Sequence, residues 1–198
     1  LATAAEQNPF TTDFFLWVDA GGDRTGFLRG KSWPQPERMA VAADKIIVLD
    51  IFGAVSQFLS TQASDLTSDE QVINATTSLA VFPNVGLTGT IFGGSARAVS
   101  ALNMSYYPTL ASFLKRGAHC MSEQVIMSGM SISARTRSSF HVVQEDVPAG
   151  VRDFFFLLRY LSSDQPGTRH GITTSTDVCK NTAHWWSPQP LEGNGLLK

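Results

Sequence analysis

Residues 14–21 read FFLWVDAG, five apolar side chains followed by one carboxylate, Asp19, at a glycine-containing turn. An apolar run without polar alternation predicts a strand over 14–18 that is covered on both faces, in the interior of a sheet. A buried carboxylate costs several kcal/mol, of order 1–7, unless another group pairs with it. We therefore expect the apolar run to hold Asp19 at the end of the strand, in a place that uses its charge.

Four further segments have the composition of strands, and one of them is the short run at residues 79–82. Residues 46–52, IIVLDIF, form a second apolar run that Asp50 interrupts. Residues 87–92 and 140–144 are shorter runs of apolar and β-branched residues, bounded by turn residues and polar segments. Both are typical of buried strands.

Helix signals lie between these strands. Pro36 opens a run of helix formers, and residues 68–71, Ser-Asp-Glu-Gln, resemble a helix start. Ser95 is placed as the N-cap of a helix over 96–116, in which Pro108 predicts a kink or a break. Ser122 begins another helix in the same way.

The alternation of strands and helices predicts an α/β layered domain over residues 1–162, followed by a loop-rich tail over 163–198. With 43% hydrophobic and 16% charged residues, the chain can bury a substantial core. A net charge of −2 gives no reason to expect a nucleic-acid partner. No apolar run reaches the ~18 residues that predict a membrane span.

Two acidic positions are candidates for chemistry. Asp19, followed by Asp23 and Arg24, would ligate a divalent cation or bind a sugar or phosphate. The structural alternative is that Asp19 accepts hydrogen bonds from amides of the turn that follows it. Glu123, beside Gln124, would project from the first turn of a helix toward a ligand, or would serve only the helix dipole.

A glycine pair gives a third candidate. Residues 88–95 read TGTIFGGS, in which Gly93 and Gly94 lie between a predicted strand and the helix that Ser95 caps. Glycines at such a turn allow a ligand to approach the backbone, and free amides at the helix start suit an anion or hydroxyl groups. Glycine pairs at such turns are also explained by packing alone.

In order along the chain, these segments resemble a known family. Residues 8–21, NPFTTDFFLWVDAG, resemble the start of the HtrL/YibB-type family of glycosyltransferase-like proteins, and residues 89–127 resemble its glycine-pair, helix and acidic-Gln region. An FFGGS turn, a helix and an acidic DES segment occur likewise in the blood-group-type galactosyltransferases. The resemblance implies a GT-A-like domain that lacks its nucleotide-binding strands, because those would precede Leu1.

The same resemblance implies roles for individual residues. Asp19 and Glu123 would be the catalytic carboxylates, converging beside a glycine-lined hollow. Donor or acceptor contacts would come from six residues: Gly93, Gly94, Ser95, Gln124, Trp17 and Arg24. Mn²⁺ or Mg²⁺ would bind at Asp19, with Asp23 as a second ligand, although the metal motif Asp-x-Asp is Asp-Ala-Gly here. Alternatively Arg24, Arg29 or Lys31 would neutralise the diphosphate without a metal.

The expected function is transfer of a sugar from a nucleotide-sugar donor to a carbohydrate or glycoconjugate acceptor. The alternative is a non-catalytic relative that binds protein partners through its aromatic residues, such as Trp185 and Trp186. Glycosylation sequons at Asn74 and Asn103 are compatible with the secretory pathway, and a cytoplasmic location fits the sequence equally well.

Overall fold

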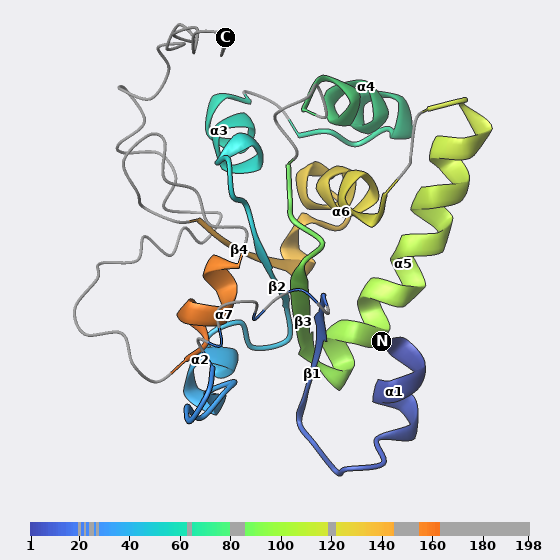
Figure 1. Ribbon diagram of the computed structural model, residues 1–198. Helices are drawn as coiled ribbons and strands as arrows, with labels where there is room; N and C mark the ends of the chain where they lie inside the picture. Colours follow the sequence, from blue (N-terminus) through green and yellow to red (C-terminus); the bar gives the residue numbers. More distant parts are fainter. Residues whose placement is uncertain are drawn as a thin grey trace, which may run out of the picture.

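A computed structural model of the chain places helices on both faces of a four-stranded mixed sheet (Figure 1). The residues it describes are 1–19, 21, 23, 26, 28–62, 65–79, 86–118, 122–144 and 155–162. The expected tail, residues 163–198, lies outside the described residues. The α/β class predicted from the sequence is therefore confirmed for the part of the chain that the structure describes.

The strands β1 (Phe14–Val18), β2 (Ile46–Leu49), β3 (Ile91–Ser95) and β4 (Phe140–Val143) lie in the order β1-β3-β2-β4. β3 is antiparallel to both of its neighbours, whereas β2 and β4 are parallel. β1, β2 and β4 consequently run in one direction and β3 in the other. The carboxyl ends of three strands and the start of β3 therefore meet at one edge of the sheet.

The prediction of an interior first strand is wrong for the sheet as described. β1 pairs only with β3 and lies at the edge, where Trp17 is 50% and Val18 is 36% exposed. The buried centre is instead β2, whose four residues are fully covered because it has a neighbour on each side and helices on each face. The apolar run of β1 reflects two covered faces at Phe14–Leu16, not a central position.

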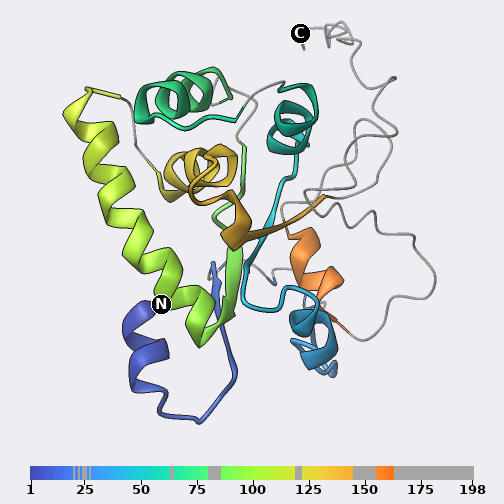
Figure 2. The same cartoon turned by 180° about the vertical axis from the view of Figure 1, so that it is seen from behind.

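Five helices share one core on one side of the sheet; the longest of them packs on the strands, and the others pack mainly on other helices (Figures 1 and 2). They are α1 (Ala2–Gln7), α3 (Ala54–Thr61), α4 (Asp69–Leu79), α5 (Ala96–Lys115) and α6 (Glu123–Ile132). Their apolar side chains pack with Ile46 and Val48 in one core, to which Phe113 and Ile126 contribute. Because side chains alternate along a strand, Ile47 and Leu49 of β2 lie on the opposite face.

The opposite face is covered by two short helices, α2 (Pro36–Ala40) and α7 (Phe156–Tyr160). Met39, Leu157 and Tyr160 are completely buried there against Ile47. The indole of Trp33 donates a hydrogen bond to Leu158 O at 3.0 Å and ties the segment before α2 to α7. A single-turn 3-10 helix (Arg137–Ser139) leads into β4.

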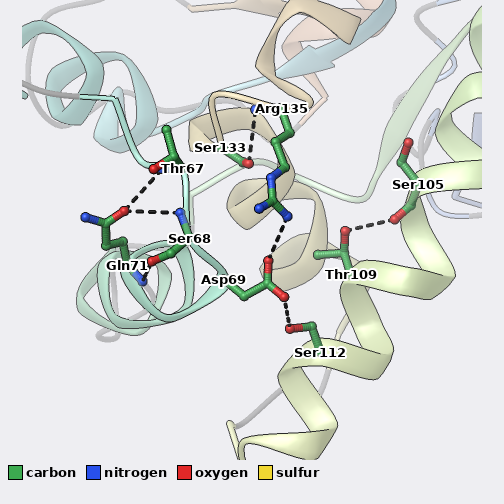
Figure 3. A network of polar contacts seen from close by, with 9 residues as sticks. All are labelled: Thr67, Ser68, Asp69, Gln71, Ser105, Thr109, Ser112, Ser133 and Arg135. Atoms are coloured by element: carbon green, nitrogen blue, oxygen red, sulfur yellow. Dashed lines mark hydrogen bonds and ion pairs between the residues drawn. The ribbon is translucent and has the colours of Figure 1, made fainter.

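Two helix starts follow the sequence signals closely. The Ser95 side chain accepts from Ala98 N at 3.2 Å, as predicted for the N-cap of α5. Before α4, Ser68 Oγ accepts from Gln71 N at 3.2 Å while Gln71 Oε1 accepts from Ser68 N at 3.1 Å (Figure 3). This reciprocal pair is a capping box. The predicted break at Pro108 is absent, since α5 runs unbroken through it.

Candidate site at the carboxyl edge of the sheet

Polar residues occupy the sheet edge at which three strands end. Asp19 follows β1, Asp50 follows β2 and Gln144 follows β4. Residues 88–90 lead into β3 at the same edge, where Thr88 N donates to Leu49 O at 2.8 Å. In open α/β sheets, ligands bind outside the carboxyl ends of the strands. We therefore take this edge as the candidate site.

Asp19 extends the β1–β3 ladder by one residue. Its amide donates to Thr90 O at 2.8 Å, which continues the pairing of Val18 with Ile91. Trp17 stacks on Phe92, with ring centroids 6.5 Å apart, on the sheet face that α5 and α6 cover. Because side chains alternate along a strand, Asp19 lies on that same face. The exposed carboxylate is thus at the end of β1, on the side of α6.

The carboxylate of Asp19 also has a local structural role. Its Oδ1 accepts from Gly21 N at 3.2 Å, the turn contact that was the alternative interpretation of this residue. Its other oxygen, Oδ2, makes no hydrogen bond with any residue that the structure describes. One oxygen of the carboxylate therefore holds the turn.

Glu123, at the start of α6, lies beside Gly89, the residue before Thr90. It is exposed and lies in the first turn of α6. A methyl group added to Gly89 would lie 2.0 Å from Glu123 Oε1 and 3.2 Å from Gln124 Cγ. The Glu123 carboxylate consequently occupies the space that a side chain at position 89 would fill. The backbone amide of Asp19 and the side chain of Glu123, distant in sequence, thus lie at the same two-residue segment, Gly89–Thr90.

Asp50 is a third carboxylate at this edge, and it is completely buried. Its Oδ2 accepts from the amide of Ser56 at 2.8 Å and from the Ser56 hydroxyl at 2.9 Å, which holds the first turn of α3. Its Oδ1 has no hydrogen-bond partner among the described residues. Burial raises the pKa of Asp50 from 3.8 to about 6, against the donors at Ser56, Ala54 and Gly53 that lower it.

Sequence reasoning missed Asp50 as a member of this group. The segment was interpreted as a strand interrupted by a charge, whereas β2 ends at Leu49 and Asp50 begins the turn. The available signal was the repeated pattern of an apolar run closed by aspartate, FFLWVD and IIVLD. Gln144 was missed as well; its amide packs on Gly53, where an added methyl group would lie 2.5 Å from Nε2.

The glycine pair lies elsewhere. Gly93 and Gly94 are within β3, paired with Leu16 and Phe15, and not in a turn after it. A methyl group on Gly93 would lie 2.0 Å from Phe15 O, and one on Gly94 would lie 2.6 Å from Lys45 O. Close packing of strands explains both glycines. With Ser95, they are at the end of β3 away from Gly89.

The remaining predicted contacts are distributed around the edge. Trp17 is exposed two residues before Asp19. Asp23 is exposed, and its Oδ2 accepts from Leu28 N at 3.2 Å within its own loop. Arg24 lies outside the described residues.

The sequence predicts a divalent-metal site at Asp19, with Asp23 as a second ligand. Nowhere in the described ranges do three His, Cys, Asp or Glu residues gather into a metal-binding group. The hard oxygen of Asp19 nevertheless suits Mg²⁺ or Mn²⁺, because such ions bind through one or two carboxylates together with substrate phosphates. The described residues therefore form no closed protein cage for a metal ion, and metal binding at Asp19 stays a prediction.

Comparisons of the chain with protein-family models, with curated proteins and with solved structures find no match. The resemblance to the HtrL/YibB-type family thus rests on the motifs alone and stays a prediction. Among the helices that the structure describes, none combines the length and the apolar character needed to cross a bilayer.

Proposed function

We propose that the carboxyl edge of the sheet is a glycosyl-transfer site, with GT-A-like organisation, for a nucleotide-sugar donor. One observation carries the proposal: the backbone of Asp19 pairs with Thr90 while the side chain of Glu123 lies against the neighbouring Gly89, so the two residues come to the same end of the sheet from different elements. Glycosyl transfer needs a carboxylate near the anomeric carbon and compensation for the charge of the departing diphosphate. Two exposed carboxylates at one end of the sheet offer part of this chemistry.

In this proposal Glu123 is the catalytic carboxylate. The absent side chain at Gly89 gives the Glu123 carboxylate room to lie against the backbone there, and the sugar ring would bind on its exposed side. There it would act as base or nucleophile, or stabilise positive charge on the sugar. Asp19 faces the diphosphate, and Mn²⁺ or Mg²⁺ held at Asp19, with Asp23 as a second candidate ligand, would supply charge neutralisation.

Further donor and acceptor contacts in this proposal come from Gln124 and Trp17 at the edge. Gln124 follows Glu123 in the first turn of α6, and its Cγ lies against Gly89. Trp17 offers an exposed indole face, and sugar rings commonly pack on such apolar surfaces. Gly93, Gly94, Ser95 and Arg24 stay candidates on the resemblance alone.

The test is incubation of the protein with UDP-, GDP- and CMP-sugars, with and without Mn²⁺, while nucleotide release is measured. Glu123→Gln should lower turnover by at least about 100-fold, the size of a lost acid–base or nucleophilic group. Glu70→Gln is the matched control, since Glu70 is also an exposed glutamate in a first helical turn, on α4. Equal rates for these two variants, or no donor binding by the wild type, would refute the proposal.

A second variant tests the geometry without changing charge. Gly89→Ala places a methyl group where Glu123 Oε1 lies, and the carboxylate must move. Because the displaced group is the end of a flexible side chain, the fold should survive. We expect nucleotide release to fall by about 10-fold or more while the melting temperature changes little.

The alternative function, a non-catalytic subunit that binds a protein partner, is supported by a different observation. Met104, Tyr107 and Leu114 are 74%, 63% and 60% exposed on α5. Their spacing of three and seven residues places them on one side of the helix. Size-exclusion chromatography with light scattering separates the two functions, since an assembly subunit would self-associate or co-elute with a partner and would leave every nucleotide-sugar intact.

A further inference from the structure

A second candidate site lies in the helical layer, away from the sheet edge. A pocket of about 310 Å³ is formed between α4, α5 and α6, and none of the edge residues discussed above lines it. Its volume is at the lower end of the ~300–1,000 Å³ that small-molecule sites occupy. It would therefore hold a ligand of about one ring.

The floor of the pocket is apolar. Val72, Phe113 and Met130 contribute side chains that are nearly fully buried. Gly129 completes the floor; a methyl group there would lie 2.8 Å from Phe113 Cζ and 3.0 Å from Thr76 Oγ1. The glycine thus allows α6 to pack closely against α5 and α4, and it leaves an apolar surface at the bottom of the pocket.

The rim is rich in hydrogen-bond acceptors. Thr109 Oγ1 donates to Ser105 O at 2.8 Å, and Ser112 Oγ donates to Asp69 Oδ2 at 2.7 Å (Figure 3). Thr136 Oγ1 donates to Met130 O at 2.6 Å. Each of these hydroxyls has used its single proton inside the protein, so it faces the pocket with lone pairs. A complementary ligand must donate hydrogen bonds.

The charges at the rim compensate each other. Arg135 Nη1 lies 3.3 Å from Asp69 Oδ1 (Figure 3), and both side chains are at least half exposed. A charged ligand would find no unpaired opposite charge here, because Arg135 and Asp69 already pair with each other. The rim therefore favours an uncharged ligand, while the Arg135 guanidinium keeps further N–H groups for its oxygens.

We propose that this pocket is a second binding site, for an uncharged ring that carries several hydroxyl groups, such as a monosaccharide unit. One face of such a ring consists of C–H groups and suits the apolar floor. Its hydroxyls donate to the lone pairs of Thr109 and Thr136 and to the Asp69 carboxylate. The inference rests on the pocket alone and holds whether or not the sheet edge transfers sugars.

The experiment is saturation-transfer NMR on the full chain with methyl glucoside, methyl galactoside, cyclohexanol and cyclohexanecarboxylate. The two glycosides should bind more tightly than cyclohexanol, which has the ring but one hydroxyl, and more tightly than the anion. Tighter binding of cyclohexanecarboxylate would make Arg135 an anion site and overturn the proposal, as would the absence of binding by either glycoside.

Variants locate the bound sugar. Thr109→Val keeps the shape of the side chain, removes its acceptor, and should weaken glycoside binding about 3- to 10-fold. Thr77→Val is the matched control, because Thr77 Oγ1 makes the same backbone hydrogen bond, to Ile73 O at 2.8 Å, outside the pocket. Ser105→Ala is the second variant if Thr109→Val lowers the melting temperature. Equal affinity of the Thr109 and Thr77 variants, or lost binding in Glu123→Gln, would overturn the assignment.

Discussion

Asp50 is the residue at which burial most strongly opposes the charged form of a side chain. It is the one completely buried carboxylate in the described part of the chain, and only one of its oxygens has hydrogen-bond partners there. Burial penalises the charged form, so its pKa is raised to about 6. The folded protein consequently binds this proton more tightly than the unfolded chain does.

This sets the sign of a pH effect on stability. Below pH 3.8 the group is protonated in both states; as the pH rises through about 6, folding must accommodate a buried charge. Between about pH 4 and pH 7, wild type should lose up to about 3 kcal/mol of unfolding free energy relative to Asp50→Asn. Urea denaturation at several pH values measures this. Asp13→Asn, at an exposed position, is the control, and identical profiles for the two variants would contradict the expectation.

At the scale of elements, β3 depends on the absence of side chains at its centre. The carbonyl of Phe15 lies 2.0 Å from the position of a methyl group on Gly93, and a backbone atom cannot move aside as a flexible side chain can. Gly93→Ala should therefore lower the unfolding free energy by about 2 kcal/mol or more. At Gly30 nothing lies within 4 Å of an added methyl group, so Gly30→Ala should cost only about 1 kcal/mol for its positive φ.

Gly93→Ala also tests the sugar contact that the family resemblance implies for Gly93. If Gly93 contacts a sugar, Gly93→Ala should abolish donor binding without a change in the melting temperature. If strand packing is its role, the melting temperature falls first. Calorimetry and donor titration on one sample distinguish the two outcomes.

The capping box is the element-level feature that starts α4. Ser68 and Gln71 satisfy each other's backbone amides, and Gln71 Oε1 also accepts from Thr67 N at 3.2 Å. Ser68→Ala should lower the unfolding free energy by about 1 kcal/mol, since an amide of the first turn loses its acceptor. Ser78→Ala, in the last turn of the same helix, is the control; its hydroxyl only donates to Asn74 O. Equal unfolding free energies would show that water replaces the cap.

At the scale of the whole molecule, the starts of α4 and α5 were predicted from the sequence, whereas the pairing of the strands was not. Ser95 as N-cap and Ser68–Gln71 as a helix start depend on residues within four positions, so the sequence contains the whole signal. The edge position of β1, by contrast, depends on β3 returning antiparallel beside it from far along the chain.

The candidate site divides in the same way. Asp19 and Glu123 were each predicted separately from the sequence, as charged residues at the ends of predicted elements. Their common neighbour, Gly89–Thr90, follows from the register of β1 on β3 and from the placement of α6, neither of which has a local signature. Asp50 lies at the same end of the sheet because β1 and β2 are both antiparallel to β3, and those pairings have no local signature either.

Two buried groups, Asp50 and His141, should affect the pH dependence of the unfolding free energy in opposite directions. His141, in β4, is 4% exposed, and its Nε2 has no hydrogen-bond partner among the described residues. Burial lowers the pKa of His141, and the positive charge of Lys45 lowers it further. The unfolded chain therefore takes up this proton first, and stability falls as the pH drops below 6.5. Asp50 has the opposite effect over an overlapping range, so wild type should show a shallow net slope.

Removing either group should expose the contribution of the other. In Asp50→Asn, the unfolding free energy should fall more steeply than in wild type as the pH decreases from about 6.5 to about 4. In His141→Gln, it should fall less steeply, or rise, over the same interval. The slope relative to wild type is the readout, because surface ion pairs contribute equally to all three proteins and cancel. Parallel curves would mean that neither buried group titrates differently in the folded and unfolded states. Slopes that change in opposite directions in the two variants, relative to wild type, would assign the acid response to Asp50 on the helix-rich side and His141 in β4.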